Sequence, residues 1–262
     1  YKTAKAKTPL KNGDNIQIWM PPPEPLVYLK PEKMDLEILF EDEHIIVINK
    51  QSGLIVHPAP GHKSGTLVNG LLFHCNDLPG INGKLRPGIV HRLDKDTSGC
   101  MVVAKSQEAL VNLQKQIKEK IASREYIAVI HGAPNSEEGQ IVGHIGRDKF
   151  NRLKYKVVEE ASGRYACTYW KLKERLGNYS LMNFKLDTGR THQIRVHCAH
   201  INHPIVGDPL YGRCKKLPCK LEGQALHAFK LGLIHPINGK EMIFEAELPL
   251  DFQKLLNVLK AK

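Results

Sequence analysis

The sequence predicts an α+β fold built on a large, mixed and mostly antiparallel sheet that is flanked by helices and loops. Several segments alternate apolar and polar residues, as strands with one exposed face do. Two of these segments are joined by a Gly-Asn pair, which is typical of a hairpin turn. Helical spacing is found only between groups of strands, and this argues against a regular βαβ repeat.

The first half of the chain predicts two strands and the clearest helix. LEILFED (36–42) and HIIVINK (44–50) are expected strands joined by an acidic turn. SQEALVNLQKQIKEKIAS (106–123) is expected to be a helix, and Ser106 suits its N-cap. Its apolar residues recur at helical spacing: Leu110, Leu113, Ile117 and Ile121.

The second half predicts further strands and one short helix. EYIAVIHG (125–132) is an expected strand, and MIFEAELP (242–249) is a later strand of the alternating kind. Residues 165–176 and 179–188 form the expected hairpin. Residues 191–201 read as a helix, with Arg195 projecting away from its buried stripe. That stripe consists of Ile194, Cys198 and Ile201.

The charge balance indicates a polyanionic partner. The 262 residues include 38 Lys and Arg against 27 Asp and Glu, which gives a net charge of +11. Such an excess is typical of a protein that binds nucleic acid. The six cysteines are scattered among apolar neighbours, which favours reduced thiols and a cytoplasmic location. No signal peptide or apolar run of membrane-spanning length is visible, so no membrane association is expected.

HRLDKDTSG, at residues 91–99, admits three interpretations. A calcium loop starting at Asp94 would need a carboxylate at its twelfth position, where the chain has Lys105, so calcium is excluded. A plain turn is compatible with the Asp, Ser and Gly residues. A reactive carboxylate is the third interpretation, because Arg92 and Lys95 would favour the ionised form of a neighbouring acid.

Five sequence blocks in the same order closely resemble the RluA/RluD-type pseudouridine synthases. They are NKQSGLIVHP (49–58), HRLDKDTSGCMVVAK (91–105), GRTHQIRVH (189–197), HPIVGDPLYG (203–212) and LHAFKLGLIHP (226–236). The resemblance covers roughly residues 35–250 and implies the pseudouridine synthase fold. It also implies isomerisation of uridine to pseudouridine in RNA, a reaction that consumes nothing and needs no cofactor or metal.

The resemblance also implies roles for individual residues. Asp94 matches the catalytic aspartate, and Asp96 beside it is expected to be structural. Arg195 matches the basic residue that pairs with that aspartate, and Tyr126 matches the tyrosine of a K-x-Y strand, with Arg124 in place of Lys. Arg92 is expected to contact RNA near the extruded base. Further candidates for phosphate or pocket contacts are Arg190, Thr191, His192 and Gln193.

The resemblance leaves the substrate and the domain organisation as expectations. Large-subunit ribosomal RNA, or ribosomal assembly intermediates, are the expected partners of a monomeric enzyme. The alternatives are a transfer RNA substrate, a catalytically silent RNA-binding or ribosome-assembly protein, and a hydrolytic N-glycosidase. Residues 1–25 are expected to contain the tail of an N-terminal RNA-binding module and a proline-rich linker, and residues 26–262 the catalytic domain.

Two further patterns are open to functional interpretation. Four histidines and a cysteine between His192 and His203 resemble zinc ligands in type, but zinc is disfavoured because helix and turn roles suffice and the reaction requires no metal. A basic group after Tyr211 is expected to follow RNA phosphates. It comprises Arg213, Lys215, Lys216 and Lys220.

Overall fold

The computed structural model describes residues 9, 11–15, 29–58, 61–75, 78–79, 87–212 and 217–261. Some predictions fall outside these residues: most of the predicted module tail and linker within residues 1–25 and, in the basic group, Arg213, Lys215 and Lys216.

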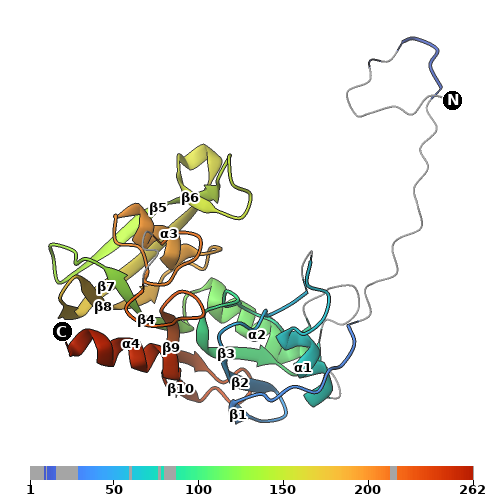
Figure 1. Cartoon of the computed structure of the whole chain (residues 1–262). Coiled ribbons are helices and arrows are strands. Elements are labelled where there is room, and N and C mark those ends of the chain that lie inside the picture. The colour runs from blue at the N-terminus through green and yellow to red at the C-terminus, as the bar shows by residue number, and fades with distance from the viewer. Residues whose placement is uncertain are drawn as a thin grey trace.

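Ten strands form one sheet in the part of the chain that the structure describes, with the order β1-β2-β3-β9-β4-β8-β7-β5-β6 and with β10 paired to β9 (Figure 1). The strands are β1 (Ile38–Glu41), β2 (Ile45–Lys50), β3 (Ser98–Ala104), β4 (Ser123–His131), β5 (Glu138–Arg147), β6 (Tyr155–Val158), β7 (Arg164–Leu176), β8 (Tyr179–Leu186), β9 (Leu226–Ile234) and β10 (Glu241–Glu245). The expected mixed, mostly antiparallel sheet is confirmed.

The sheet has two wings that meet where β3 and β9 pair. One wing is β1–β3, and the other contains β4–β10. The β3–β9 ladder is parallel and has only two residue pairs, Ser98 with His227 and Gly99 with Ala228. Gly99 has a φ of +116°, and a Cβ atom there would clash with the Ala228 carbonyl, so this close approach requires glycine.

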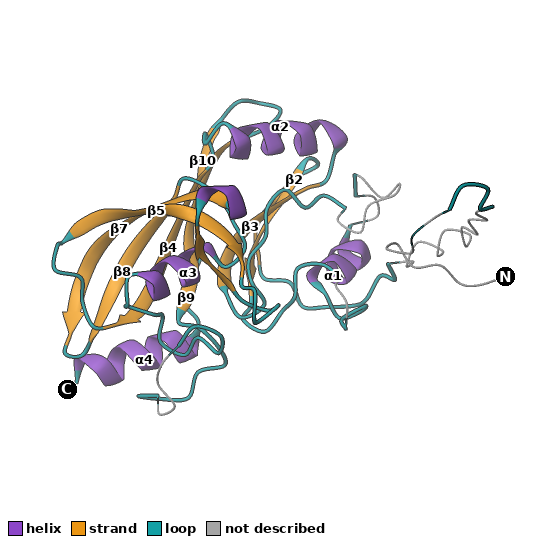
Figure 2. Cartoon of the chain, turned by 90° about the horizontal axis from the view of Figure 1, so that it is seen from above, coloured by secondary structure: helices purple, strands orange, loops and turns teal. Residues whose placement is uncertain are grey.

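Helices cover both faces of the sheet. They are α1 (Leu67–His74), α2 (Gln107–Lys118), α3 (Gln193–His200) and α4 (Leu250–Lys260), with a short 3₁₀ turn at Glu160–Ser162. Figure 2 shows α2 on one side of the strands and α4 on the opposite side. The two larger clusters of buried apolar residues lie on these two faces, one with α2 and the other with α1, α3 and α4.

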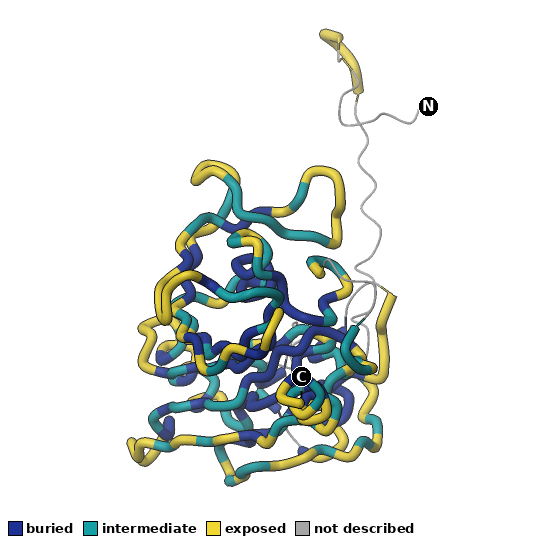
Figure 3. The backbone as a smooth tube through the Cα atoms, turned by 60° about the vertical axis from the view of Figure 1, so that its left-hand side comes forward, coloured by how far each residue is buried: buried dark blue, intermediate teal, exposed yellow. Residues whose placement is uncertain are grey.

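Strand β2 explains why a continuous apolar run lies at 45–48. Ile45 and Val47 pack in the cluster beneath α2, whereas Ile46 and Ile48 pack in the cluster on the opposite face. Alternate side chains of a strand point to opposite faces, so a strand covered on both sides needs apolar residues throughout. Figure 3 shows this buried centre, with exposed backbone concentrated at turns and hairpin tips.

The structure corrects two predicted boundaries, the end of α2 and the end of β10. Helix α2 begins after the Ser106 cap, whose side chain accepts a hydrogen bond from Ala109 N, but it ends at Lys118 rather than at residue 123. Lys120 then adopts a left-handed φ of 63°, so the expected apolar stripe stops and Ile121 is 46% exposed. Strand β10 ends at Glu245, four residues earlier than expected, and the chain passes into α4.

Candidate active site

The loop at 91–97 is both a turn and the holder of a carboxylate. Thr97 N donates to Asp94 O at 3.1 Å, which closes a tight turn immediately before β3. Asp94 projects from this turn into a cavity, and its side chain is 16% exposed. The turn interpretation and the carboxylate interpretation therefore describe the same residues.

A buried lysine holds this loop from beneath. Lys50, at the end of β2, is 1% exposed, and its Nζ donates to the carbonyl oxygens of Gln51 and Leu54 at 2.8 Å and of Lys95 at 2.9 Å. Burial lowers the pKa of Lys50 to about 7, and the charges of Asp96 and Asp94 oppose that shift. Lys50 thereby ties the end of β2 to the residue that follows Asp94.

Arg195 forms the expected ion pair with Asp94. Its Nη1 donates to Asp94 Oδ2 at 2.9 Å. The prediction that Arg195 projects off the buried stripe misplaced it, because the side chain is only 4% exposed. Helix α3 lies between the sheet and the loop that contains Asp208, so all sides of its first turns are covered.

Asp208 is a site residue that the sequence analysis missed. Arg195 donates Nε to Asp208 Oδ2 at 2.8 Å and Nη2 to Asp208 Oδ1 at 2.9 Å. The Asp208 carboxylate also accepts from the backbone N–H groups of Leu210 and Tyr211. Its only sequence signal was its position inside HPIVGDPLYG, one of the five matching blocks.

This arrangement keeps the guanidinium charged and fixed. Burial alone would lower the pKa of Arg195, but hydrogen bonding and Coulombic attraction to Asp208 and Asp94 outweigh it and raise the pKa above its ordinary value. Asp208 uses both oxygens in a fork that sets the plane of the guanidinium. One remaining N–H of Arg195 then orients the Asp94 carboxylate toward the cavity.

His192 and Tyr211 complete this end of the cavity. His192 caps α3 in a left-handed conformation with φ 56°. Its Nδ1 shares a 2.9 Å hydrogen bond with the Tyr211 hydroxyl, and its Nε2 lies 3.9 Å from Asp94 Oδ1. The Tyr211 hydroxyl also accepts from Tyr155 N at 2.9 Å, and Arg195 lies over the Tyr211 ring. Burial lowers the pKa of His192 and so favours the neutral ring.

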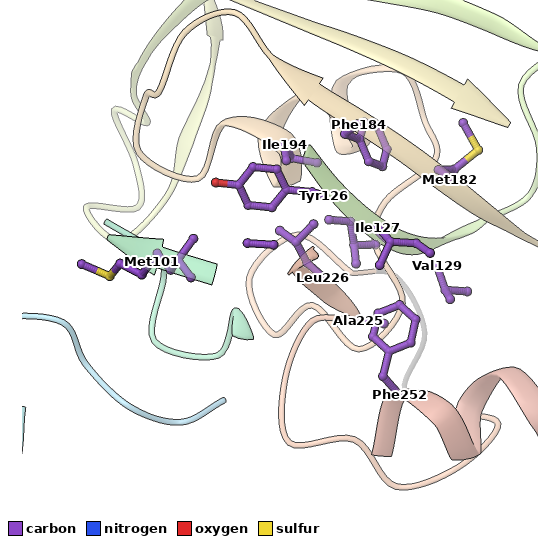
Figure 4. Packing of buried hydrophobic residues seen from close by; sticks show 14 of the residues in the cluster. Met101, Tyr126, Ile127, Val129, Met182, Phe184, Ile194, Ala225, Leu226 and Phe252 are labelled. Atoms are coloured by element: carbon purple, nitrogen blue, oxygen red, sulfur yellow. The ribbon is translucent and has the colours of Figure 1, made fainter. Parts of the chain in front are cut away.

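Tyr126 lies on β4 at the wall of the cavity. It is 6% exposed, and burial raises the pKa of its hydroxyl, which stays protonated at neutral pH. Figure 4 shows its ring beside Ile194 and Leu226, with the hydroxyl pointing away from Ile127 and Val129. The ring is therefore backed by the apolar core on one side.

The cavity has a volume of about 580 Å³ and joins the two wings of the sheet. All eight sequence-predicted site residues line it: Arg92, Asp94, Tyr126, Arg190, Thr191, His192, Gln193 and Arg195. Arg92 is exposed there. The Arg190 side chain is partly engaged, because its Nε donates to Tyr165 O at 2.8 Å.

Gln193 has a different role from the substrate contact that was expected. Its Nε2 donates to Cys167 O and Thr168 Oγ1, and its Oε1 accepts from Thr188 Oγ1 and Arg190 N. Two donors and two acceptors exhaust the capacity of a primary amide. Gln193 therefore positions the loop that carries Arg190 and His192.

The histidines near α3 have separate partners. His197 Nδ1 bonds Thr168 Oγ1, whereas His203 Nδ1 bonds the His131 carbonyl. Within the described part of the chain, the residues whose potential ligand atoms do converge are Glu41, His74 and Cys75, at a different place. In that group His74 and Lys105 both bind Glu41 directly, at 2.7 Å and 2.6 Å.

Comparison with known proteins identifies the family. The model of the RNA pseudouridylate synthase family matches residues 44–200, which include the Asp94 loop, Tyr126 and Arg195. The chain belongs to this family. It is an RNA pseudouridine synthase, an isomerase whose substrate is RNA.

Curated relatives align over nearly the whole chain. An uncharacterized RNA pseudouridine synthase of Synechocystis is 50% identical over 254 residues, covering 97% of this chain and 77% of the relative. An uncharacterized RNA pseudouridine synthase of Bacillus subtilis is 47% identical, covering 98% and 83%. The ribosomal large subunit pseudouridine synthase D of Zymomonas mobilis is 45% identical, covering 95% and 80%.

Solved structures share the fold. Human RNA pseudouridylate synthase domain containing 4 superposes with a TM-score of 0.67 at 24% identity, covering 86% of this pseudouridine synthase and 93% of that chain. Human RNA pseudouridylate synthase domain containing 1 gives 0.64 at 22% identity, covering 93% and 98%. Among the described residues, no helix combines the length and apolar character needed to cross a bilayer.

Proposed function

We propose that this pseudouridine synthase modifies uridines of large-subunit ribosomal RNA in the cytoplasm, with Asp94 as its catalytic carboxylate. Relatives from Zymomonas, Neisseria and Xanthomonas that carry this ribosomal name are 42–45% identical over 95–99% of the chain. The observation that carries the catalytic assignment is the Asp94 carboxylate, which faces the cavity and is held at 2.9 Å by a buried arginine.

The reaction needs few groups. The N1–C1′ bond of the uridine breaks, the uracil turns, C5 bonds to C1′, and the C5 proton is lost while N1 gains one. No atom is added to the RNA overall, so the protein needs to supply no group that remains in the product. Three routes are open to Asp94: attack on C1′, attack on C6, or acceptance of a proton from C2′. Each route needs a fixed, partly desolvated carboxylate.

The cavity walls suit a base that has left its stack. Extrusion of a base costs a few kcal/mol, least for single-stranded or loop nucleotides. The Tyr126 ring, backed by the core, provides a flat face on which a loosened uracil can stack. Arg92 is exposed at the cavity and can contact the RNA beside the extruded base. Thr191 and His192 lie on the opposite loop.

The boundaries of the catalytic domain are a further part of this proposal. We assign residues 26–262 to the catalytic domain, since the sheet begins at Ile38 and the last helix ends at Lys260. Residues 1–25 are assigned to the tail of an RNA-binding module and its linker. The five described cysteines are all free thiols, in keeping with a reducing compartment.

The test is carbodiimide mapping of pseudouridines in RNA from cells that possess or lack the gene. One or more large-subunit ribosomal sites should disappear without the gene and return with the wild-type chain but not with Asp94→Asn. Loss confined to transfer RNA would overturn the ribosomal assignment. An unchanged map would mean that the protein is catalytically silent in the cell.

A further inference from the structure

Arg124 is a buried arginine at the cavity wall that lies outside the catalytic ion pairs. It lies on β4 two residues before Tyr126, so both side chains point to the same face of the strand. Arg124 is 8% exposed and lines the same cavity as Asp94. The pKa of Tyr126 responds to the charges of both Arg124 and Asp94, which places Tyr126 within electrostatic reach of each.

The guanidinium of Arg124 has no counterion in the described part of the chain. Its Nε is buried without an acceptor, and no carboxylate of a described residue pairs with it. The lining of the same cavity includes three further cationic residues, Lys118, Lys120 and Arg190. The two acids of the lining already have cationic partners: Lys120 holds Asp187 at 2.7 Å, and Arg195 holds Asp94 at 2.9 Å. An arginine remains ionised in proteins, so its charge here is uncompensated.

His91 adds a second donor without an acceptor. Its Nε2 accepts a hydrogen bond from Val102 N at 3.1 Å, so the proton of the neutral ring resides on Nδ1. Burial, aided by the charge of Arg124, lowers the pKa of His91 to about 3, so the ring is neutral. The protonated Nδ1 is buried and has no acceptor among the described residues.

We propose that Arg124 binds a phosphodiester of the RNA, at the nucleotide that enters the cavity or at its neighbour. This inference rests on the RNA substrate of the proposed function. A phosphate offers only acceptors and a negative charge, and the guanidinium fork fits two of its oxygens. A buried, unpaired ion is costly, and an incoming anion removes that cost on binding. The cationic surroundings favour a phosphate over the neutral carbonyl oxygens of uracil.

Gly189 lets the loop after β8 approach the Arg124 guanidinium closely. A Cβ atom at residue 189 would lie 2.9 Å from Arg124 Nη1, so the loop after β8 closes directly over the guanidinium. Gly189→Ala should push the tip of Arg124 aside while Arg124 keeps its charge.

The test compares two matched substitutions in the full chain. Arg124→Gln removes the proposed phosphate ligand. Arg175→Gln is the control, because Arg175 lies beside the β7–β8 turn, at the opposite end of β8 from the cavity residue Leu186. The probe is ribosomal RNA, and the measurement is the slope of log binding constant against log salt concentration.

Arg124→Gln should reduce that slope by about 1, as loss of one phosphate contact does. The KM for RNA should rise more than kcat falls. Arg175→Gln should change neither, and Gly189→Ala should reproduce part of the Arg124→Gln effect. Weaker binding with an unchanged slope would overturn the proposal in favour of a neutral contact to the base. An unchanged affinity with a lower melting temperature would make Arg124 purely structural.

A measurement on the wild-type protein covers the case in which Arg124→Gln does not fold. Inorganic phosphate should shift the Arg124 Nε–H resonance at concentrations that compete with RNA. No shift up to concentrations that displace RNA would overturn the proposal. These binding readouts are independent of isomerisation, so the phosphate site and the ribosomal assignment fail separately.

Discussion

Two groups of residues that line the cavity differ in how their buried donors are paired. In the first group, Arg195 is shared by Asp94 and Asp208, and each of its nitrogens has an acceptor. In the second group, Arg124 and His91 keep buried donors without acceptors. A side chain whose hydrogen bonds are complete is held in one position, whereas a side chain with unsatisfied donors is suited to a ligand that arrives later. The following predictions probe that contrast, from the largest effect to the smallest.

Asp94→Asn should remove the negative charge from the ion pair that Asp94 forms with Arg195. The amide keeps the shape and one acceptor for Arg195 but loses the negative charge. We expect kcat for pseudouridine formation to fall by about 10³-fold or more, because the reaction has no other assigned carboxylate. RNA affinity should change little. Asp96→Asn, two residues along the same loop, is the matched control. A variant at 94 within tenfold of wild type would remove Asp94 from the mechanism.

Asp208→Asn should weaken the second ion pair of Arg195 and leave the Asp94 carboxylate unchanged. The side chain of Asp208 is fully buried and forms the fork on Arg195. Removing one partner of a buried ion pair costs about 3–5 kcal/mol, and denaturant unfolding would measure this loss. Glu137→Gln, which breaks the exposed pair with Arg175, should cost less than about 1 kcal/mol. Equal losses in the two variants would contradict the distinct role of Asp208.

Tyr126→Leu tests whether the Tyr126 ring, which lines the cavity from β4, stacks on the base. Loss of base stacking should lower kcat/KM by an amount equivalent to about 1–3 kcal/mol. Tyr126→Phe keeps the ring and should retain most of that activity if stacking is the main contribution. Steady-state kinetics on RNA would measure both variants, and full activity of Tyr126→Leu would make stacking irrelevant.

His91→Gln tests the group of buried donors that have no acceptor, to which His91 belongs together with Arg124. The folded-state pKa of His91 is about 3, below its ordinary 6.5, so between these pH values the unfolded chain holds a proton that the folded chain rejects. Stability should therefore fall as pH decreases from 6.5 toward 3. The glutamine variant should lack this component, a difference of about 2 kcal/mol at pH 5. Parallel pH profiles would show that His91 is not buried in neutral form.

The sequence predicted those parts of the molecule that depend on local pattern. The β7–β8 hairpin, the Ser106 cap and the apolar strand β2 follow from residue types a few positions apart. The Asp94–Arg195 pair was expected from sequence blocks that resemble a family, because 101 residues separate its partners and no local rule joins them.

The remainder depended on tertiary packing. The burial of Arg195 follows from a loop closing over α3, which helical periodicity does not contain. The role of Asp208 is to bind Arg195, and this contact is visible only in the folded structure. Gln193 was expected to contact the substrate, yet its side-chain amide makes four hydrogen bonds to other groups of the protein. The end of α2 shifted because Lys120 turns left-handed, which a lysine gives no reason to expect.

The short ladder between β3 and β9 gives the Asp94–Arg195 ion pair a place in the architecture of the sheet. Among the described strands, the two wings are joined by two residue pairs of this ladder. Asp94 precedes β3 on one wing and Arg195 belongs to the other, so the 2.9 Å bond between their side chains is a further tie across the junction. The direction in which the Asp94 carboxylate points therefore depends on both halves of the sheet.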